Sequence, residues 1–179
     1  VVVLDASLAR IRYLYDAFGG LFRTRYASRG EVEAAVAEAD LVIGAVLIPG
    51  AAAPKLVSRA QLGLMQPGSA VVDVAIDQGG CFETSRPTTH EDPVYAVDGI
   101  LHYCVANMPG AVARTATQGL GNATLPFVLA LAHKGWRQAC EADPHLLAGL
   151  NVHAGALTYP AVGRALGIDV LSPKLALRR

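Results

Sequence analysis

Short apolar runs alternate with segments of helical periodicity over the first hundred residues, and this alternation constrains the fold more than any other feature. The strand candidates are residues 1–4, 21–26, 41–45, 70–74 and 101–105, with helical patterns at 8–18, 28–39 and 58–65. Gly19-Gly20 is expected to end the first helix, and Ser28 to cap the second in a capping box with Glu31. Strands separated by helices of this length pair in parallel, because each crossover has to return over the sheet. Nearly continuous apolar runs are typical of strands buried on both faces. The sequence therefore predicts a parallel α/β sheet.

The pattern changes after Pro109 and Gly110. From Ala111 to about Leu166 the sequence is helical in character, and its breaks are at Gly135, Pro144, Gly155 and Pro160. We therefore expect an α/β domain over residues 1–114 and a helical segment over residues 115–179.

Composition excludes several classes of protein. Fifteen basic residues balance fifteen acidic ones, so a general nucleic-acid-binding surface is not expected. A chain that is 53% hydrophobic and 17% charged is not disordered, and no apolar stretch approaches the roughly 18 residues of a membrane-spanning helix. The cysteines, Cys81, Cys104 and Cys140, lack metal or Cys-x-x-Cys spacing and are expected to be buried free thiols of a cytoplasmic protein.

Asp5 ends the first strand candidate. An acidic residue at the end of the second strand of a dinucleotide-binding unit accepts hydrogen bonds from the ribose hydroxyls and favours NAD over NADP, whose 2′-phosphate it repels. The alternative is an aspartate that ends a strand or caps the next helix. The glycine-rich phosphate loop that should precede it by about 20 residues is absent, and residues 119–124, Gly-Leu-Gly-Asn-Ala-Thr, lie in a helical pattern. This absence predicts that the first strand of the unit is missing from the chain.

The most informative stretch is residues 73–81, where a buried strand runs into Asp77, Gln78, Gly79, Gly80 and Cys81. Glycines let the backbone approach a ligand closely, and a partly desolvated carboxylate at a strand end has the chemistry to exchange protons. The alternative is an aspartate satisfied by the backbone N–H groups of a glycine turn.

Two further strand ends carry candidate ligand contacts. Val46 and Leu47 follow the strand at 41–45, where loops of open α/β sheets line the ligand crevice. Asn107 and Met108 follow the strand at 101–105; an amide can hold a carboxamide group, and methionine forms a flexible apolar wall. The five histidines show no metal spacing.

Residues 39–57, 72–83, 85–89 and 103–109 together resemble bacterial L-alanine dehydrogenases, and the similarity continues through 122–126 to 155–157. The Ile-Asp-Gln-Gly-Gly-Cys run at 76–81, combined with Asn-Met-Pro at 107–109, is specific for this family. The wider family includes the NAD-binding part of proton-translocating transhydrogenase, whose matching segment departs from Ile-Asp-Gln-Gly-Gly.

The resemblance implies an NAD-dependent enzyme that interconverts L-alanine with pyruvate and ammonia, built on a Rossmann-type doubly wound sheet followed by a helical part of the substrate domain. It implies that Asp77 is the catalytic acid/base and Asp5 the ribose-binding acid, with Arg10 near the adenosine end. The implied cofactor site comprises Asp5, Arg10, Ser28, Val46, Leu47, Val74, Ala75, Ile76, Asp77, Arg86, Val105, Ala106, Asn107 and Met108.

Two positions depart from the family pattern. Relatives often carry two serines where this chain has Ala27 and Ser28, so Ser28 is the remaining candidate for the adenosine contact. Some relatives carry a Glu and a His as a metal pair where this chain has Ala130 and Lys134, so no metal is expected. The resemblance also implies a homo-oligomer, usually a hexamer, with no nucleic-acid or membrane partner.

In this family an N-terminal half supplies the glycine-rich loop, the substrate-binding Arg and Lys, and a catalytic His. In the strand order 3-2-1-4-5-6 the missing strand lies between two strands of this chain. We therefore expect residues 1–5 to lose one neighbour, residues 41–45 to face a gap, and the chain alone to be inactive. Two alternatives stay open: a truncated, non-catalytic nucleotide-binding or interaction module, and a transhydrogenase-like NAD-binding domain.

Overall fold

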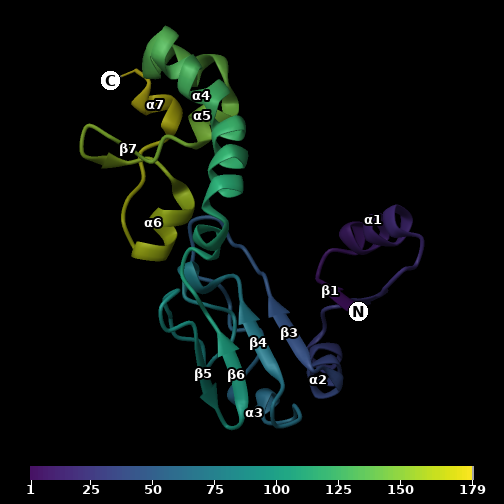
Figure 1. The fold of residues 1–179 in the computed structure, drawn as a ribbon. Helices are drawn as coiled ribbons and strands as arrows, with labels where there is room; N and C mark the ends of the chain where they lie inside the picture. Colours follow the sequence, from purple (N-terminus) through teal and green to yellow (C-terminus); the bar gives the residue numbers. More distant parts are fainter. Residues whose placement is uncertain (179) are drawn as a thin grey trace. The chain divides into compact units, whose positions relative to one another are not determined.

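A computed structural model describes residues 1–178 (Figure 1). Contacts divide the chain into two units. The first unit contains Val1–Leu47 and Ala53–Asn107, and the second contains Ile48–Ala52 and the chain from Met108 onward.

The first unit has two sheets, as Figure 1 shows. In the smaller sheet, β1 (Val2–Asp5) pairs in parallel with β2 (Arg23–Tyr26), and helix α1 (Leu8–Phe18) connects them. The larger sheet has the order β3-β4-β6-β5. Its members are β3 (Leu41–Gly44), β4 (Ala70–Asp73), β6 (Ile100–Tyr103) and β5 (Val94–Val97). The first three are parallel and β5 is antiparallel, so the predicted α/β fold with a mainly parallel sheet is confirmed.

The strand pairing agrees with the gap expected from the sequence. Within residues 1–178, β1 pairs only with β2, and β3 pairs only with β4. Each of these strands therefore has one edge of backbone N–H and C=O groups that takes no partner from another described strand.

Two of the predicted helices begin with serine caps, of which only the cap at Ser28 was expected from the sequence. The Ser28 hydroxyl caps α2 (Arg29–Glu38) by accepting the N–H of Glu31, although the Glu31 side chain turns to Arg25 instead of closing a capping box. A complete capping box forms between Ser58 and Gln61 at α3 (Arg59–Leu62).

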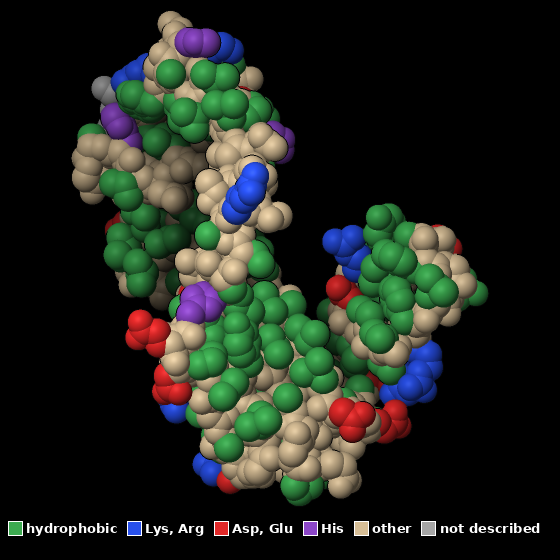
Figure 2. Space-filling model, viewed as in Figure 1, with side chains coloured by type: hydrophobic (Ala, Val, Ile, Leu, Met, Phe, Trp, Pro, Cys, Tyr) green, Lys and Arg blue, Asp and Glu red, His purple; other side chains and the backbone are tan. Residues whose placement is uncertain are grey.

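The hydrophobic core lies on one face of the larger sheet. Val71 and Phe82 are fully buried there, and Val36 of α2 and Leu62 of α3 belong to the same cluster. On the other face, Leu41 and Ile43 are 54% and 61% exposed, and hydrophobic side chains gather over this sheet in Figure 2. The expectation that β3 is buried on both faces is therefore wrong for the described residues, because side chains alternate along the strand and only one side meets α2 and α3.

Strand β5 was not predicted from the sequence. It forms a hairpin with β6 through Asp98 and Gly99, whose φ angles are 52° and 80°. An Asp-Gly pair with positive φ at both positions is typical of a two-residue type I′ turn. The Asp98 carboxylate also binds the Arg59 guanidinium at 2.8 Å, which lowers the pKa of Asp98 from its ordinary value.

The second unit is mainly helical. Its longest element is α4 (Ala113–Ala142), which bends at Gly135, where φ is 73°. The elements around it are η2 (Met108–Val112), α5 (Pro144–Ala148), β7 (Val152–His153), β8 (Ala156–Leu157), α6 (Pro160–Leu166) and α7 (Pro173–Ala176). The β7–β8 hairpin departs from the helical segment expected here; its strands are two residues long, too short to leave an alternating pattern. None of the helices in residues 1–178 is long and apolar enough to cross a membrane.

Gly44 and Gly119 offer a matched pair of glycine substitutions. A Cβ on Gly44 would lie 2.8 Å from a ring carbon of Phe82 and closer still to the Cys81 sulfur, whereas a Cβ on Gly119 in α4 meets no atom within 4 Å. We predict that Gly44→Ala destabilises the protein by about 1–3 kcal/mol through overpacking. Gly119→Ala should instead stabilise it by about 0.5–1 kcal/mol through helix propensity. Chemical denaturation of the two variants measures both effects, and an equal stability for both would contradict the packing around Gly44.

Candidate functional site

Three parallel strands bring the candidate residues to one edge of the larger sheet. Val46 and Leu47 follow β3, residues 74–77 follow β4, and residues 105–107 follow β6. Because β3, β4 and β6 are adjacent and parallel, their carboxyl ends lie side by side. The Val74 N–H donates to the Gly44 carbonyl at 2.8 Å, which joins the first two of these segments. Open α/β sheets bind ligands at this edge.

The segment after β4 turns sharply through the 3-10 helix η1 (Ile76–Gln78). The N–H groups of Gln78 and Gly80 donate to the Ala75 carbonyl at 2.9 and 3.0 Å, and Gly79 has a φ of 92°. This turn exposes the Asp77 side chain. The partial desolvation of Asp77 that the sequence suggested is therefore not provided by the described residues.

Asp77 and Asn107 lie together although 30 residues separate them. The Asn107 N–H donates to Asp77 Oδ2 at 3.5 Å. Asn107 has a φ of 56°, and its carbonyl oxygen lies 3.0 Å from Nε2 of His90. The Asn107 side chain is exposed at the same edge. A carboxylate and an amide from two neighbouring strand ends are therefore both available to a ligand.

Arg86 is held by Tyr95, a residue that the sequence did not suggest. The Tyr95 hydroxyl accepts the Arg86 backbone N–H at 2.8 Å and donates to the Thr84 carbonyl at 2.9 Å. The Arg86 guanidinium lies 4.0 Å from the centre of the Tyr95 ring, a cation–π distance. Burial and a hydrogen bond with Cys104 raise the pKa of Tyr95 to about 12, so its hydroxyl keeps its proton. Tyr95 could not be found from the sequence, because it lies on the unpredicted strand β5.

The remaining predicted residues lie on the smaller sheet or beside it. Asp5 ends β1, and its Oδ1 accepts the N–H of Ser7, the cap of α1, at 2.7 Å. Arg10 is exposed on α1, and its guanidinium lies 5.5 Å from the Tyr13 ring centre. Asp5 thus ends its strand and bonds to the residue that caps α1 without being the cap itself, and within residues 1–178 only its Oδ1 takes a hydrogen bond. Met108 is the exception to this location, because it begins η2 in the second unit.

The residues at the carboxyl edge of the larger sheet fit the nicotinamide end of NAD. An aromatic ring with a carboxamide needs apolar walls and a few polar groups, and the edge offers Leu47 and Val74, 64% and 51% exposed, beside the amide of Asn107. Within residues 1–178 no glycine-rich loop joins a strand to a helix as a pyrophosphate site requires, and Gly119 and Gly121 lie inside α4.

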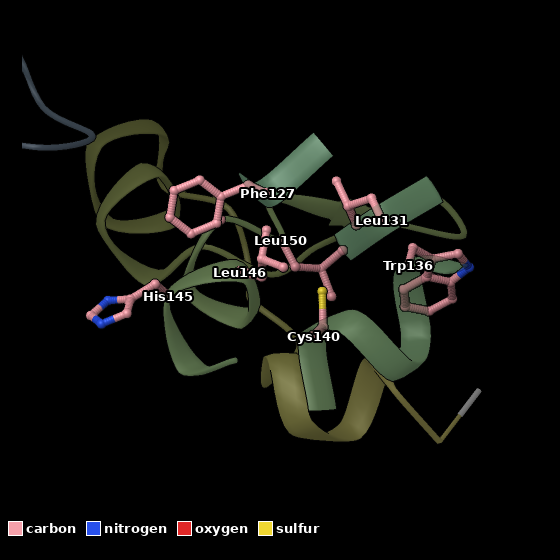
Figure 3. A pocket seen from close by; sticks show the side chains of 8 residues that line it. Phe127, Leu131, Trp136, Cys140, His145, Leu146 and Leu150 are labelled. Atoms are coloured by element: carbon pink, nitrogen blue, oxygen red, sulfur yellow. The ribbon is translucent and has the colours of Figure 1, made fainter. Parts of the chain in front are cut away.

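The second unit has a hollow with a volume of about 340 Å³. Phe127, Leu131, Leu146 and Leu150 line it, and Figure 3 shows the His145 ring pointing away from this group. Cys140 also lines it, but burial raises the pKa of its thiol, so this cysteine is a poor nucleophile. The hollow lacks the convergent polar groups of the sheet edge and is a weaker candidate for chemistry.

A mainly parallel α/β sheet with an exposed carboxylate, an amide and apolar side chains at its carboxyl edge defines a nucleotide-binding protein of the doubly wound class. The chain belongs to the family described as "Alanine dehydrogenase/PNT, C-terminal domain", which matches residues 1–160.

Individual relatives agree with this family. An alanine dehydrogenase of Halomonas elongata is 62% identical over 169 residues, which cover 94% of this chain and 46% of the relative. An alanine dehydrogenase of Mycobacterium tuberculosis is 53% identical over 177 residues, which cover 99% of this chain and 48% of the relative. The chain therefore spans about half the length of these relatives.

Solved structures give the same result. A structure of L-alanine dehydrogenase matches with a TM-score of 0.80 and 50% identity over 93% of this chain and 46% of the other. A structure of transhydrogenase from Sinorhizobium meliloti matches with a TM-score of 0.56 and 29% identity, over 66% of this chain and 34% of the other. The dehydrogenase likeness is thus both closer and more extensive than the transhydrogenase likeness.

The prediction that Cys81, Cys104 and Cys140 are buried free thiols is confirmed. Burial and, after it, the neighbouring Asp73 raise the pKa of Cys81 to about 12. The Cys81 thiol therefore keeps its proton at pH 8, and we predict that it resists alkylation in the native protein and reacts only after unfolding. Peptide mapping after iodoacetamide treatment, with and without guanidinium chloride, measures this. Rapid modification of native Cys81 would contradict the environment described.

Proposed function

We propose that this chain is the cofactor-binding half of an NAD-dependent L-alanine dehydrogenase, which converts L-alanine reversibly to pyruvate and ammonia. The observation that carries the proposal is the position of Asp77: it lies in the family-specific segment 76–81, exposed at the carboxyl edge of β4 and in contact with Asn107. The identity to alanine dehydrogenases over nearly the whole chain supports the same activity.

In this proposal the residues of the sheet edge hold the nicotinamide end. Val46, Leu47, Val74, Ala75 and Ile76 border the ring, and Arg86 with Val105, Ala106, Asn107 and Met108 completes the pocket. Asp5 binds the ribose through Oδ2, the oxygen that Ser7 leaves available, while Arg10 and Ser28 serve the adenosine end.

When bound, NAD accepts the hydride from alanine Cα. The part of this chain in the chemistry is to handle protons. Asp77 exchanges a proton with the substrate or a water as the amino group leaves. The N–H of Asn107, donating to Oδ2, orients the carboxylate and leaves Oδ1 for that exchange.

The proposal includes a second half of the protein. A strand of that half pairs with the unpaired edges of β1 and β3, and it comes from the same polypeptide or from another chain. That half also brings the glycine-rich loop, the substrate-binding groups and the histidine that the resemblance implies.

We also propose a homo-oligomer located in the cytoplasm; the buried free thiols fit a reducing compartment. A non-catalytic module remains the competing hypothesis, because the sheet is divided in two.

Asp77→Asn in the full-length protein tests the catalytic assignment. We predict that kcat for alanine-dependent NADH formation falls about 10²–10⁴-fold, because an amide cannot take up the proton. Asp98→Asn is the matched control: Asn tolerates the left-handed φ of the β5–β6 turn, and the change is at the opposite end of β6. An Asp77→Asn enzyme with wild-type kcat would disprove the role of Asp77. A wild-type protein that forms no NADH from alanine would favour the non-catalytic module.

Asp5→Asn tests the ribose contact. Removing the carboxylate charge removes the repulsion of a 2′-phosphate, so we predict that the preference for NAD over NADP in kcat/KM falls at least about 10-fold. Asp16→Asn, on the exposed surface of α1, is the control for charge alone. Unchanged cofactor preference in Asp5→Asn would mean that Asp5 only holds the backbone of Ser7 at the start of α1.

A further inference from the structure

The loop that carries Asp77, residues 75–82, is anchored at both ends by one buried carboxylate. Asp73 is fully buried at the end of β4. Its Oδ1 accepts the N–H of Ala75 at 3.1 Å, and its Oδ2 accepts the N–H groups of Cys81 at 2.9 Å and Phe82 at 3.4 Å. The hydroxyl of Ser85 also donates to Oδ2. The carboxylate therefore binds the backbone just before and just after the turn.

A lysine binds the carbonyl groups of the same loop. Nζ of Lys55 donates to the carbonyl oxygens of Gly79 at 2.6 Å, Gly80 at 2.8 Å and Phe82 at 3.1 Å. An ammonium group has three N–H donors, and these contacts use all three. The loop is thus held through its N–H groups by Asp73 and through its carbonyl groups by Lys55.

Gly80 shows how closely the loop approaches the carboxylate. Its φ is 73°, and a Cβ at this position would lie 2.6 Å from Asp73 Oδ2 and 2.8 Å from the Ser85 Cβ. Any side chain here would push the loop away from its anchor. The anchor therefore explains the glycine at position 80, whereas the glycine at position 79, where a Cβ would meet no atom within 4 Å, is explained by its φ of 92°.

We propose that Asp73 and Lys55 are positioning residues that fix residues 75–82, so that Asp77 meets its substrate in a single orientation. This inference rests on the proposed function, since it gives Asp77 the catalytic role. The Asp73 carboxylate binds N–H groups of the loop and the Lys55 ammonium binds its carbonyl groups, and in the proposal neither touches a reacting atom. Hydrogen bonds to charged groups are short and directional, which suits them to fix a loop whose carboxylate is exposed.

The decisive variant is Lys55→Met in the full-length protein, because Lys55 is exposed and its loss should leave the core intact. We expect kcat for alanine oxidation to fall about 10–100-fold, as misplacement of a reacting group by about 1 Å does. KM for alanine should change less than about threefold, and the isotope effect on kcat with alanine deuterated at Cα should fall, because the proton step that Asp77 serves becomes rate-limiting in place of hydride transfer. Lys174→Met in α7 removes the same charge elsewhere and should keep wild-type kinetics.

Hydrogen–deuterium exchange provides a readout that does not depend on activity. In Lys55→Met the amides of residues 79–82 should exchange at least about 10-fold faster than in wild type, while those of β4 stay protected. Ser85→Ala removes one donor to Asp73 and should lower kcat in the same direction by a smaller factor. Asp73→Asn tests the anchor directly where that variant folds.

The outcomes separate this inference from the proposed function. If Asp77→Asn is inactive while Lys55→Met keeps wild-type kcat and exchange, the positioning role is overturned and the function stands. If Lys55→Met only lowers the melting temperature, with kcat per folded site unchanged, Lys55 is merely structural and the inference is again overturned. If the wild-type enzyme forms no NADH from alanine, the proposed function fails and the positioning role fails with it.

Discussion

The parallel pairing of β3, β4 and β6 is the constraint on which the candidate site depends. Parallel strands run in the same direction, so the segments that follow them emerge at one edge although they are far apart in sequence. The register from Gly44 to Asp73 and from Val72 to Tyr103 sets how these segments meet. Asp77 and Asn107 come within hydrogen-bonding distance because their strands end side by side. A shift of one residue in either pairing would turn Asp73 from the buried face to the other face of the sheet.

Much of this arrangement was predictable, because the strongest sequence signals are local. The apolar runs marked β3, β4 and β6, and the glycines after Asp77 marked a turn at a strand end. Gly19 in the left-handed conformation ends α1 where the Gly-Gly pair suggested. The Ser28 cap was predicted too. The ion pair of Glu31 with Arg25, which replaces the second bond of the capping box, was not predicted, because the arginine comes from the preceding strand β2. Local patterns fix where elements begin, and long-range partners decide which side-chain contacts form.

The parts that were missed have physical reasons. Strand β5 is only four residues long, Val-Tyr-Ala-Val, which is too short to show a period, and only the Asp-Gly turn after it indicated a hairpin. Missing β5 meant missing Tyr95 and the cation–π contact that holds Arg86. Lys55 gave no signal, because its three carbonyl partners lie 24 to 27 residues away along the chain. The exposed face of β3 was also missed, since an apolar run shows that a strand suits burial without showing what covers it.

The buried Asp73 carboxylate links several positions that otherwise look unrelated. A carboxylate in the interior is tolerated only when hydrogen-bond donors surround it, and here the donors are backbone N–H groups from both sides of a turn. That requirement brings the chain back at Cys81 and Phe82, which buries the Cys81 thiol and places it beside a carboxylate; burial, and after it the carboxylate, raise the pKa of this thiol. It also leaves no room for a side chain at Gly80, and it directs the Ser85 hydroxyl inward. The glycine at position 80 and the serine at position 85 therefore follow from Asp73, and the orientation of Asp77 follows from the loop that they help to hold.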